Sequence, residues 1–490
     1  MKNQNKMKNQ MKSYVTYFVM MFALLLTTAS AALAANFTVN MDTDLKDLVP
    51  GDGICHAAYR TCTLRAAIEE ANALPGKDNI GFSQSFSEPN ALKTIVLTLG
   101  QLEIKSEMSI YGTGARKLMI DGNHTSRVFN VTAPQSQIYI SGLTIQNGFT
   151  YTPDFVSCAA GICLLNGKVF LDRVAVRNNV STGVNPQLRE YGGGLANYDL
   201  MQLHNCTVSG NKGGVGGGIY NKGQMYMDNT TVSGNTAGWG GGIYIAGSFL
   251  MTFNITVSDN QAQTDGGGVW NNNAGGVWNN NPSSFTPVNT IIAGNGAPSN
   301  NDVRGLINSQ GNNLIENRGN SSGYVASDLP DGTNPLLGAL QNNGGPTDTH
   351  ILLAGSPAID AGNDCKVYAS INCAPYGDDQ RYIGFQRKVG SSVDIGAVEI
   401  QAQSVAVVQI GGKVLKPKGQ GLNNAVVALT GTDGAPRTVQ TDSSGNYSFD
   451  DVTPGRSYFI SVESRLYSYA TQSIFVTEAR NDVNFVPERN

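Results

Sequence analysis

The stretch Asn205-Cys-Thr-Val-Ser-Gly-Asn211 decides the fold, because the chain repeats it at a nearly constant step. Close copies occupy 229–235 and 254–260, and each alternates apolar with polar residues, which is the pattern of a β-strand. A Gly triplet followed by an aliphatic residue recurs at the same step, beginning at Gly192, Gly216, Gly240 and Gly266. A repeat of about 24 residues with short strands and Asn or Gly corners is typical of one coil of a parallel β-helix.

The repeat also predicts which residues stack in columns along the axis of the solenoid. Its valines form an inward column, and the threonines before them form an outward column: Thr144, Thr207, Thr231 and Thr256. Cys206 falls in a second inward column beside Val and Ile equivalents, so we expect a buried, free thiol. Asn at the corners tolerates left-handed backbone, and stacked Asn side chains can bond to one another along the axis.

Composition and charge exclude several classes of protein. Only 14% of the 490 residues are charged and 58 are Gly, which argues against a coiled coil, while 40% hydrophobic residues argue against a disordered chain. The net charge is −4 without a basic patch, so neither nucleic acid nor an anionic membrane is an expected partner.

Residues 1–34 have the pattern of a secretory signal peptide. Four lysines precede an apolar run over 14–33 that ends in the small-x-small sequence Ala32-Leu33-Ala34. The alternative is an uncleaved membrane anchor. Cleavage near Ala34 predicts a secreted or cell-surface protein with no membrane span in the mature chain.

The N-terminal end of the solenoid needs a cap, because an open β-helix exposes its core. Residues 62–73 are predicted to form an amphipathic capping helix with Leu64, Ala67, Ile68 and Ala71 on one face, within a cap over 35–77. The β-helix itself is predicted over 78–311. In an exported protein, near pairs of cysteines indicate disulfides: Cys55/Cys62, Cys158/Cys163 and Cys365/Cys373.

Several stretches resemble known families. Cys62-Thr-Leu-Arg-Ala-Ala resembles the Cys-Ser-Leu-Arg-Glu-Ala motif of secreted bacterial β-helix proteins, and the repeats are similar to those of pectin-lyase-like and polymorphic outer-membrane proteins. Residues 312–399 resemble the choice-of-anchor Q segment. The motifs that carry this resemblance include 343–350 (Asn-Gly-Gly-Pro-Thr-Asp-Thr-His), Asp379-Gln-Arg381 and Asp394-Ile-Gly-Ala-Val-Glu399. The resemblance implies that this segment ends a right-handed β-helix and that the protein is displayed at the surface, with no reaction implied.

Residues 408–487 resemble a carboxypeptidase regulatory-like domain, a small transthyretin-like β-sandwich, on motifs such as Thr441-Asp-Ser-Ser-Gly-Asn-Tyr-Ser-Phe449. Short alternating strands with frequent turn signals support this assignment. A linker over 400–407 separates the sandwich from the solenoid. The predicted fold class is therefore all-β, a parallel β-helix followed by a β-sandwich.

The repeats contain one cluster of candidate catalytic residues. Glycoside hydrolysis needs two carboxylates about 5–10 Å apart on one face. Alignment of the repeats places Asp172, His204 and Asp228 in one column, so the two Asp are candidate catalytic residues; the alternative is an outward surface column. A second acidic pair, Asp378-Asp379, is predicted to support a turn.

A second pattern, of aromatic residues after the Gly triplets, indicates a ligand-binding surface. The outward residues after the Gly triplets include Tyr220, Tyr244 and Trp270, and a local duplication adds Trp278. Aromatic rings beside Asn amides suit sugar rings, whereas the alternative is a ladder that only stabilises the coil or is buried under the 181–191 loop. The loop before Cys55 supplies candidates for structural calcium: Asp42, Asp44, Asp47 and Asp52. No other cofactor is expected.

The leading functional hypothesis is an exported, non-catalytic, adhesin-like β-helix protein that binds a polysaccharide or another cell-envelope component. One alternative is a polysaccharide lyase or glycoside hydrolase that uses the Asp172/Asp228 face. The other is a structural surface spacer. The sequence leaves the oligomeric state open.

Overall fold

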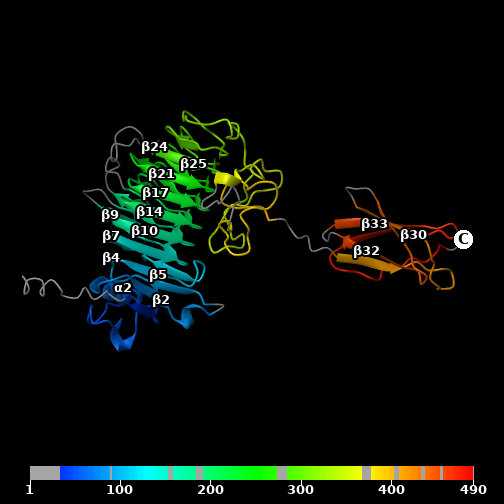
Figure 1. The fold of residues 1–490 in the computed structure, drawn as a ribbon, viewed down its shortest axis with the longest axis horizontal. Helices are drawn as coiled ribbons and strands as arrows, with labels where there is room; N and C mark the ends of the chain where they lie inside the picture. Colours follow the sequence, from blue (N-terminus) through cyan, green and yellow to red (C-terminus); the bar gives the residue numbers. More distant parts are fainter. Residues whose placement is uncertain are drawn as a thin grey trace, which may run out of the picture. The chain divides into compact units, whose positions relative to one another are not determined.

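The protein is described by a computed structural model that covers residues 34–88, 91–152, 158–183, 191–272, 284–366, 377–401, 408–431, 436–452 and 456–488. The chain divides into two compact units after Gln401, within the predicted linker 400–407. The first unit contains the predicted solenoid, and the second contains the predicted sandwich (Figure 1).

The N-terminal end of the first unit is closed by helix α2 (Leu64–Ala73), flanked by two short 3-10 turns, η1 (Ala58–Arg60) and η2 (Gln84–Phe86). Thr63 caps α2, because its side chain accepts a hydrogen bond from the amide of Ala66. The predicted apolar face of the helix is fully buried in the core of the first coils. The predicted capping helix is therefore confirmed (Figure 1).

The first long sheet is entirely parallel, as the repeat predicts. Its strands stack one coil above the next from the blue end to the green end of Figure 1. Among the described residues they are β1 (Asn36–Val39), β2 (Asp78–Phe82), β4 (Leu102–Ile104), β5 (Met108–Tyr111), β7 (Phe129–Ser141), β10 (Ile162–Asp172), β13 (Leu195–Asn197), β14 (Leu200–His204), β16 (Ile219–Asn221), β17 (Gln224–Asp228), β20 (Ile243–Ala246), β21 (Phe249–Phe253), β24 (Val269–Asn272), β25 (Ser284–Val288) and β27 (Val303–Arg304).

The second long sheet runs along the other side of the core and is built from the quoted repeat. Its described strands are β3 (Lys93–Val96), β6 (Leu118–Asp121), β8 (Thr144–Gln146), β11 (Ala175–Arg177), β15 (Thr207–Ser209), β18 (Thr231–Ser233), β22 (Thr256–Ser258), β26 (Ile291–Ala293) and β28 (Leu314–Ile315). The residues pair in the predicted register, with Val208 beside Val232 and Val232 beside Val257. Two short parallel pairs complete the coils: β9 (Phe149–Thr152) with β12 (Val180–Gly183), and β19 (Thr236–Trp239) with β23 (Gln261–Asp265).

The Asn positions of the repeat have two separate structural roles. The first Asn of each copy sits at a left-handed corner, with φ of 54° at Asn205 and 43° at Asn229. The last Asn of each copy points inward and forms a continuous ladder of side-chain hydrogen bonds, from Asn179 through Asn211, Asn235 and Asn260 to Asn295. Each amide donates to the next oxygen at 2.9 to 3.0 Å, which satisfies polar groups buried in the core. The predicted bonding along the axis is confirmed.

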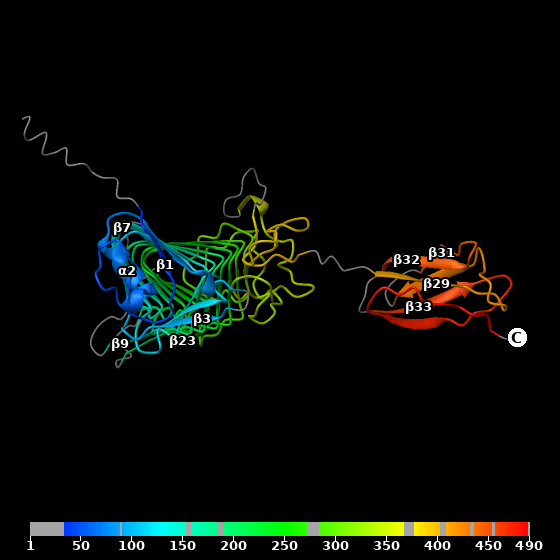
Figure 2. The ribbon, with the colours of Figure 1, turned by 90° about the horizontal axis from the view of Figure 1, so that it is seen from below.

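The segment over 312–399 packs along the outside of the second long sheet, seen as the yellow loops beside the green coils in Figure 2. It contains the 3-10 turn η3 (Asp364–Lys366). Its polar groups bond to the outward Thr column: Thr207 donates to the carbonyl of Asp348, Thr231 donates to Gln380, and the amide of Ala397 donates to Thr256. The Thr column faces outward as predicted, but this cover buries it.

The second unit is an antiparallel β-sandwich. One sheet pairs β29 (Val408–Lys413) with β32 (Asn446–Val452), and the other joins β31 (Arg437–Gln440), β30 (Val426–Gly431), β33 (Arg456–Glu463) and β34 (Gln472–Val476). Its core includes Ile410, Val427, Phe449, Ile460 and Phe485. The predicted all-β class, with a parallel β-helix and a small sandwich, is confirmed.

Two predicted disulfides are present, Cys55–Cys62 and Cys158–Cys163. Cys365 is also disulfide-bonded, while its predicted partner Cys373 lies outside the described residues. Cys206 is buried and free, as its place in an inward column predicts. No helix in the described parts of the chain is long and apolar enough to cross a membrane.

Candidate functional site

The predicted acidic column exists with the predicted register. Asp172 lies beside His204, His204 beside Asp228, and Asp228 beside Phe253 on successive coils. These residues end strands β10, β14, β17 and β21, where the chain turns into the second long sheet. The sequence therefore placed all three polar side chains together.

Both candidate catalytic carboxylates have protein donors, but only Oδ2 of Asp172 is bonded, and its Oδ1 is buried without a hydrogen-bond partner. Asp172 accepts hydrogen bonds from the hydroxyl of Tyr139 at 2.9 Å and from Nε of Arg173 at 2.8 Å. Asp228 is bonded to Nδ1 of His204 at 2.5 Å. The ring of Tyr382, from the 312–399 segment, lies 4.4 Å from the guanidinium of Arg173 and covers this end of the column.

The electrostatics of the cluster act in two directions. Burial raises the pKa of Asp228, opposed by the hydrogen bond and charge of His204 and reinforced by the charge of Asp172. Burial of the imidazole opposes its protonation, but the hydrogen bond to Asp228 and the charges of Asp228 and Asp172 outweigh it and raise the pKa of His204. Burial and the neighbouring Asp172 raise the pKa of Tyr139 to about 12. The side chain of Asp228 is 12% exposed and that of Asp172 is 14% exposed. A general acid and base need access to a substrate. Both carboxylates are largely buried within an ion-pair network with Arg173 and His204.

The acidic pair Asp378-Asp379 also has a structural role. Asp379 is fully buried, accepts both ends of the Arg381 guanidinium, and its carbonyl accepts the amide of Tyr382. The predicted support of a turn is confirmed at Asp379. Its neighbour Gln380, which sequence analysis did not single out, donates to the carbonyl of Cys206 and to the hydroxyls of Thr207 and Thr347. Only its place in a quoted family motif could have marked it.

The predicted aromatic column also exists, since Ala196, Tyr220, Tyr244 and Trp270 pair in register on β13, β16, β20 and β24. The rings of Tyr220 and Tyr244 are stacked with centroids 5.9 Å apart, and Trp270 follows at 5.5 Å. The expectation of an open face is nevertheless wrong at Tyr220 and Tyr244, which are each only 4% exposed.

The reason for this burial is a second ladder that folds over the rings. Tyr191, Val215 and Trp239 pair in parallel on successive coils just before the Gly triplets and pack against Tyr220 and Tyr244. Tyr191 stacks on Tyr220 with centroids 4.2 Å apart. The alternative of ring burial is thus the correct one for these two positions.

Trp270 is the exception, because it is only partly buried. The guanidinium of Arg304 lies 4.9 Å from its ring and pairs with the carboxylate of Asp265. Beside it, Nδ2 of Asn272 donates to the hydroxyl of Tyr244. We call Trp270, Arg304, Asp265 and Asn272 the Trp270 patch. Trp278, the fourth predicted member of the binding face, lies outside the described residues.

Arg304 is the residue of this patch that sequence analysis missed. It is the next member of the aromatic column, because β24 pairs with β27 and Trp270 lies beside Arg304. The duplication near Trp278 interrupts the constant spacing of the repeat, so the sequence does not reveal that Arg304 lies beside Trp270.

The four calcium candidates each contact other groups of the protein. Asp42 pairs with Lys93, Asp44 pairs with the buried Arg65, Asp47 accepts the amides of Val49 and His56, and Asp52 accepts the amide of Ile54. Within the described residues, no three His, Cys, Asp or Glu side chains are grouped so that they could hold a metal ion. The aspartates fold the cap loop by accepting protein donors.

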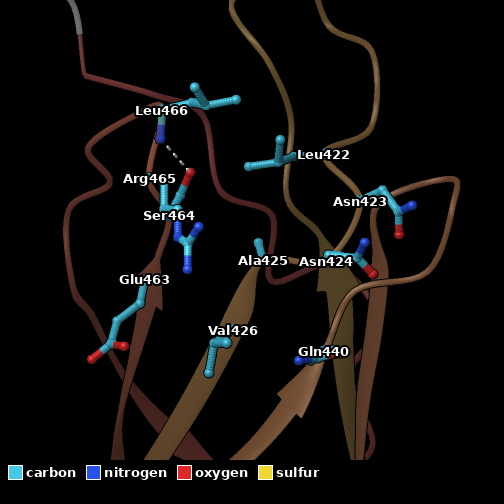
Figure 3. A pocket seen from close by; sticks show the side chains of 10 residues that line it. All are labelled: Leu422, Asn423, Asn424, Ala425, Val426, Gln440, Glu463, Ser464, Arg465 and Leu466. Atoms are coloured by element: carbon cyan, nitrogen blue, oxygen red, sulfur yellow. Dashed lines mark hydrogen bonds between the residues drawn. The ribbon is translucent and has the colours of Figure 1, made fainter.

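The sandwich carries an open hollow of about 650 Å³ at one end of β30 and β33, shown in Figure 3. Polar side chains line it, among them Asn423, Asn424, Gln440, Glu463 and Arg465, and Leu466 at its rim is 74% exposed. No prediction pointed here, because the lining comes from three separate segments that only the folded sandwich brings together.

Comparison with known proteins gives one matching family model and similar solved structures. Residues 409–487 match the family model of the carboxypeptidase regulatory-like domain. No curated protein matches the chain. Among solved structures, the chain is similar to one titled crystal structure of pectate lyase Pel9A, at 13% identity and a TM-score of 0.37, over 76% of this chain and 98% of that one. The second unit is therefore similar to carboxypeptidase regulatory-like domains, as its sequence motifs predict.

Proposed function

We propose that this chain is an exported, non-catalytic binding protein of the cell surface or extracellular space, and that it binds a glycan at the Trp270 patch. The observation that carries the proposal is the partly exposed ring of Trp270 at the end of a stacked aromatic column, flanked by charged and amide groups.

The chemistry of the patch suits a sugar. An indole ring stacks against the apolar face of a pyranose, and Arg304 and Asn272 supply polar groups for hydroxyls. The buried Asp265 holds Arg304 in place through their ion pair. The side chain of Arg304 is 45% exposed, so it can move aside or share the ring with a ligand. The column beneath is fixed by burial, which orients Trp270 before a ligand arrives.

Export is supported by the signal-like sequence over 1–34 and by the disulfides, which persist in oxidising compartments. We further propose that 312–399 is a choice-of-anchor Q segment. Its motif residues Asp379, Arg381 and Glu399 are buried in paired charges, the last with Arg387, and these pairs shape the segment covering the Thr column.

The experiment is glycan-array binding by residues 35–490, alongside Trp270→Ala and Trp270→Phe. We expect one glycan class to bind, at least a tenfold loss in Trp270→Ala, and partial recovery with Phe, which restores a ring. Tyr111→Ala is the matched control, because Tyr111 is an exposed aromatic of the same unit, 45% exposed, and lies apart from the patch on β5.

Two other outcomes would redirect the assignment. Equal binding by Trp270→Ala, with loss in Phe475→Ala, would move the glycan site to the sandwich, where Phe475 is 60% exposed. A folded wild-type chain that binds no glycan would contradict the proposal and favour the surface spacer. Turnover of a bound polysaccharide that is abolished in Asp172→Asn would favour the lyase or hydrolase alternative.

A further inference from the structure

The first strand of the cap carries an unusual contact at its start. The backbone N–H of Ala35 donates to Oδ1 of Asp78 at 2.8 Å, and the carbonyl of Ala35 accepts the amide of Asn79. Strand β1 then continues in register with β2, from Asn36 beside Asn79 to Val39 beside Phe82. Asp78 is therefore the group that meets the chain where the cap begins.

Asp78 is incompletely partnered in this arrangement. Asp78 is 0% exposed. The second oxygen of its carboxylate, Oδ2, is buried without a hydrogen-bond partner. Burial raises the pKa of Asp78, opposed only by the hydrogen bond from Ala35. A buried carboxylate with one amide donor is costly, since unpaired buried charges are normally neutralised or paired.

Charged groups on the neighbouring elements do not fill this gap. Lys77 and Glu107 pair with each other at the surface, and on α2 Arg65 pairs with Asp44. Glu69 and Glu70 on the same helix accept amides of the cap loop. Strand β1 carries no ionisable side chain.

We propose that the Ala34–Ala35 bond is the processing site, and that the α-ammonium released at Ala35 is the missing partner of the Asp78 carboxylate. This inference rests on the export in the proposed function. A signal peptidase hydrolyses the bond with one water molecule, which leaves a carboxylate on Ala34 and a protonated amine on Ala35. Small residues at positions 32 and 34 suit that enzyme class, and Ala34 is exposed.

The exchange of one peptide N–H for an ammonium changes the contact in two ways. The ammonium offers three donors, enough for Oδ1 and for the unpartnered Oδ2, and it brings a full opposite charge. Processing therefore fastens β1 to β2 and stabilises the cap in the mature protein, while a chain that keeps its leader has the weaker, half-partnered contact.

The test compares two otherwise identical chains, one beginning at Ala35 and one keeping Ala34, each released from a fusion without extra residues. Hydrogen exchange of the β1 amides of Phe37 and Val39 is measured at pH 7 by mass spectrometry. We expect exchange to be at least tenfold slower in the chain that begins at Ala35. The difference should vanish in Asp78→Asn and above about pH 10, where the amine is neutral, since a free α-amine has a pKa near 7.7–8.0.

A third chain keeps the proposal falsifiable if Asp78→Asn fails to fold. Acetylation of the Ala35 amine removes the charge and leaves a single N–H donor, as in the longer chain, so it should restore that chain's fast exchange. Equal exchange in the Ala35 and Ala34 chains, or a difference that survives acetylation, would overturn the pairing.

The processing bond is tested separately by the mass of the chain exported from a bacterial host. A mature chain that begins at Ala35 supports the site, and one that begins elsewhere overturns it while export stands. A chain that is not exported contradicts the proposed function, and the exchange comparison still decides the pairing.

Discussion

The β-helix has two outward columns, the Thr column and the aromatic column. Strand alternation predicts that both face solvent, but the structure buries the Thr column and, in the aromatic column, Tyr220 and Tyr244. The Thr column is covered from a distance, since Thr231 bonds to Gln380, 149 residues later. The aromatic column is covered by residues near it in the chain: Val215 and Trp239 lie on the coils that carry Tyr220 and Tyr244, and Tyr191 lies on the preceding coil.

The two columns show two ways in which an outer face of the solenoid is covered by other residues. Distant cover uses hydrogen bonds to hydroxyls, so it specifies one docked position for the 312–399 segment. Local cover uses apolar packing by residues that precede the Gly triplets, Tyr191, Val215 and Trp239. Within the described part of the column, the local cover stops at Trp270, where the next member is Arg304 and the ring is partly exposed.

The largest effect is expected for a substitution within the 312–399 segment, which covers the Thr column. Arg387→Ala leaves the buried Glu399 without its ion-pair partner, so the free energy of unfolding should fall by about 3–5 kcal/mol. Urea unfolding followed by tryptophan fluorescence reports this unit, because all three Trp precede Gln401. Lys77→Ala, which removes an exposed pair, is the control and should cost less than about 0.5 kcal/mol. Equal losses in the two variants would contradict a structural role for the buried pair.

The next effect tests the local cover. Tyr244→Ala removes a buried, stacked ring and should cost about 3 kcal/mol in the same unfolding measurement. Tyr244→Phe keeps the ring and loses only the hydrogen bond from Asn272, so about 1 kcal/mol is expected. A negligible cost for Tyr244→Ala would mean that the ring is open to solvent and would restore Tyr244 to the glycan face.

A smaller effect is expected in the Thr column itself. Thr231→Val conserves shape but leaves Oε1 of the buried Gln380 without its donor, which should cost about 1–2 kcal/mol. Thr38→Val, on an exposed position of β1, is the matched control and should be nearly neutral. If both variants are neutral, the hydroxyl contacts do not hold the segment in place.

The smallest effect is a pH dependence beside Tyr382, where the segment meets the acidic column. The pKa of His204 is raised in the folded protein, so its contribution to stability is present below about pH 6.5 and is lost as pH rises through the folded value. Because His204 is partly exposed, the contribution should stay below about 1 kcal/mol. The difference between the unfolding midpoints at pH 6 and pH 9 should shrink in His204→Asn and not in the exposed control His124→Asn, while the part that comes from the buried Glu399, whose pKa is raised to about 7, remains. An unchanged pH dependence in His204→Asn would exclude this ion pair as its source.

Much of the solenoid could be predicted because its determinants are local. Alternation placed Val208, Val232 and Val257 inside, left-handed corners suited Asn205 and Asn229, and the helix over Leu64–Ala73 followed from its apolar face. The acidic column was found for the same reason, since a constant step puts Asp172, His204 and Asp228 in register. The step is lost at the duplication near Trp278, which is why Arg304 escaped notice.

The sequence by itself determined the coil, its corners, the capping helix and the side of each strand on which a residue lies. Tertiary structure alone decided which outward residues reach solvent, because that depends on segments far away in the chain or on neighbouring coils. Strand alternation has a period of two and carries no information about what packs on the outer face. Burial of the Thr column under Gln380, the commitment of Asp172 and Asp228 to protein donors, and the half-partnered carboxylate of Asp78 arise only when the chain folds.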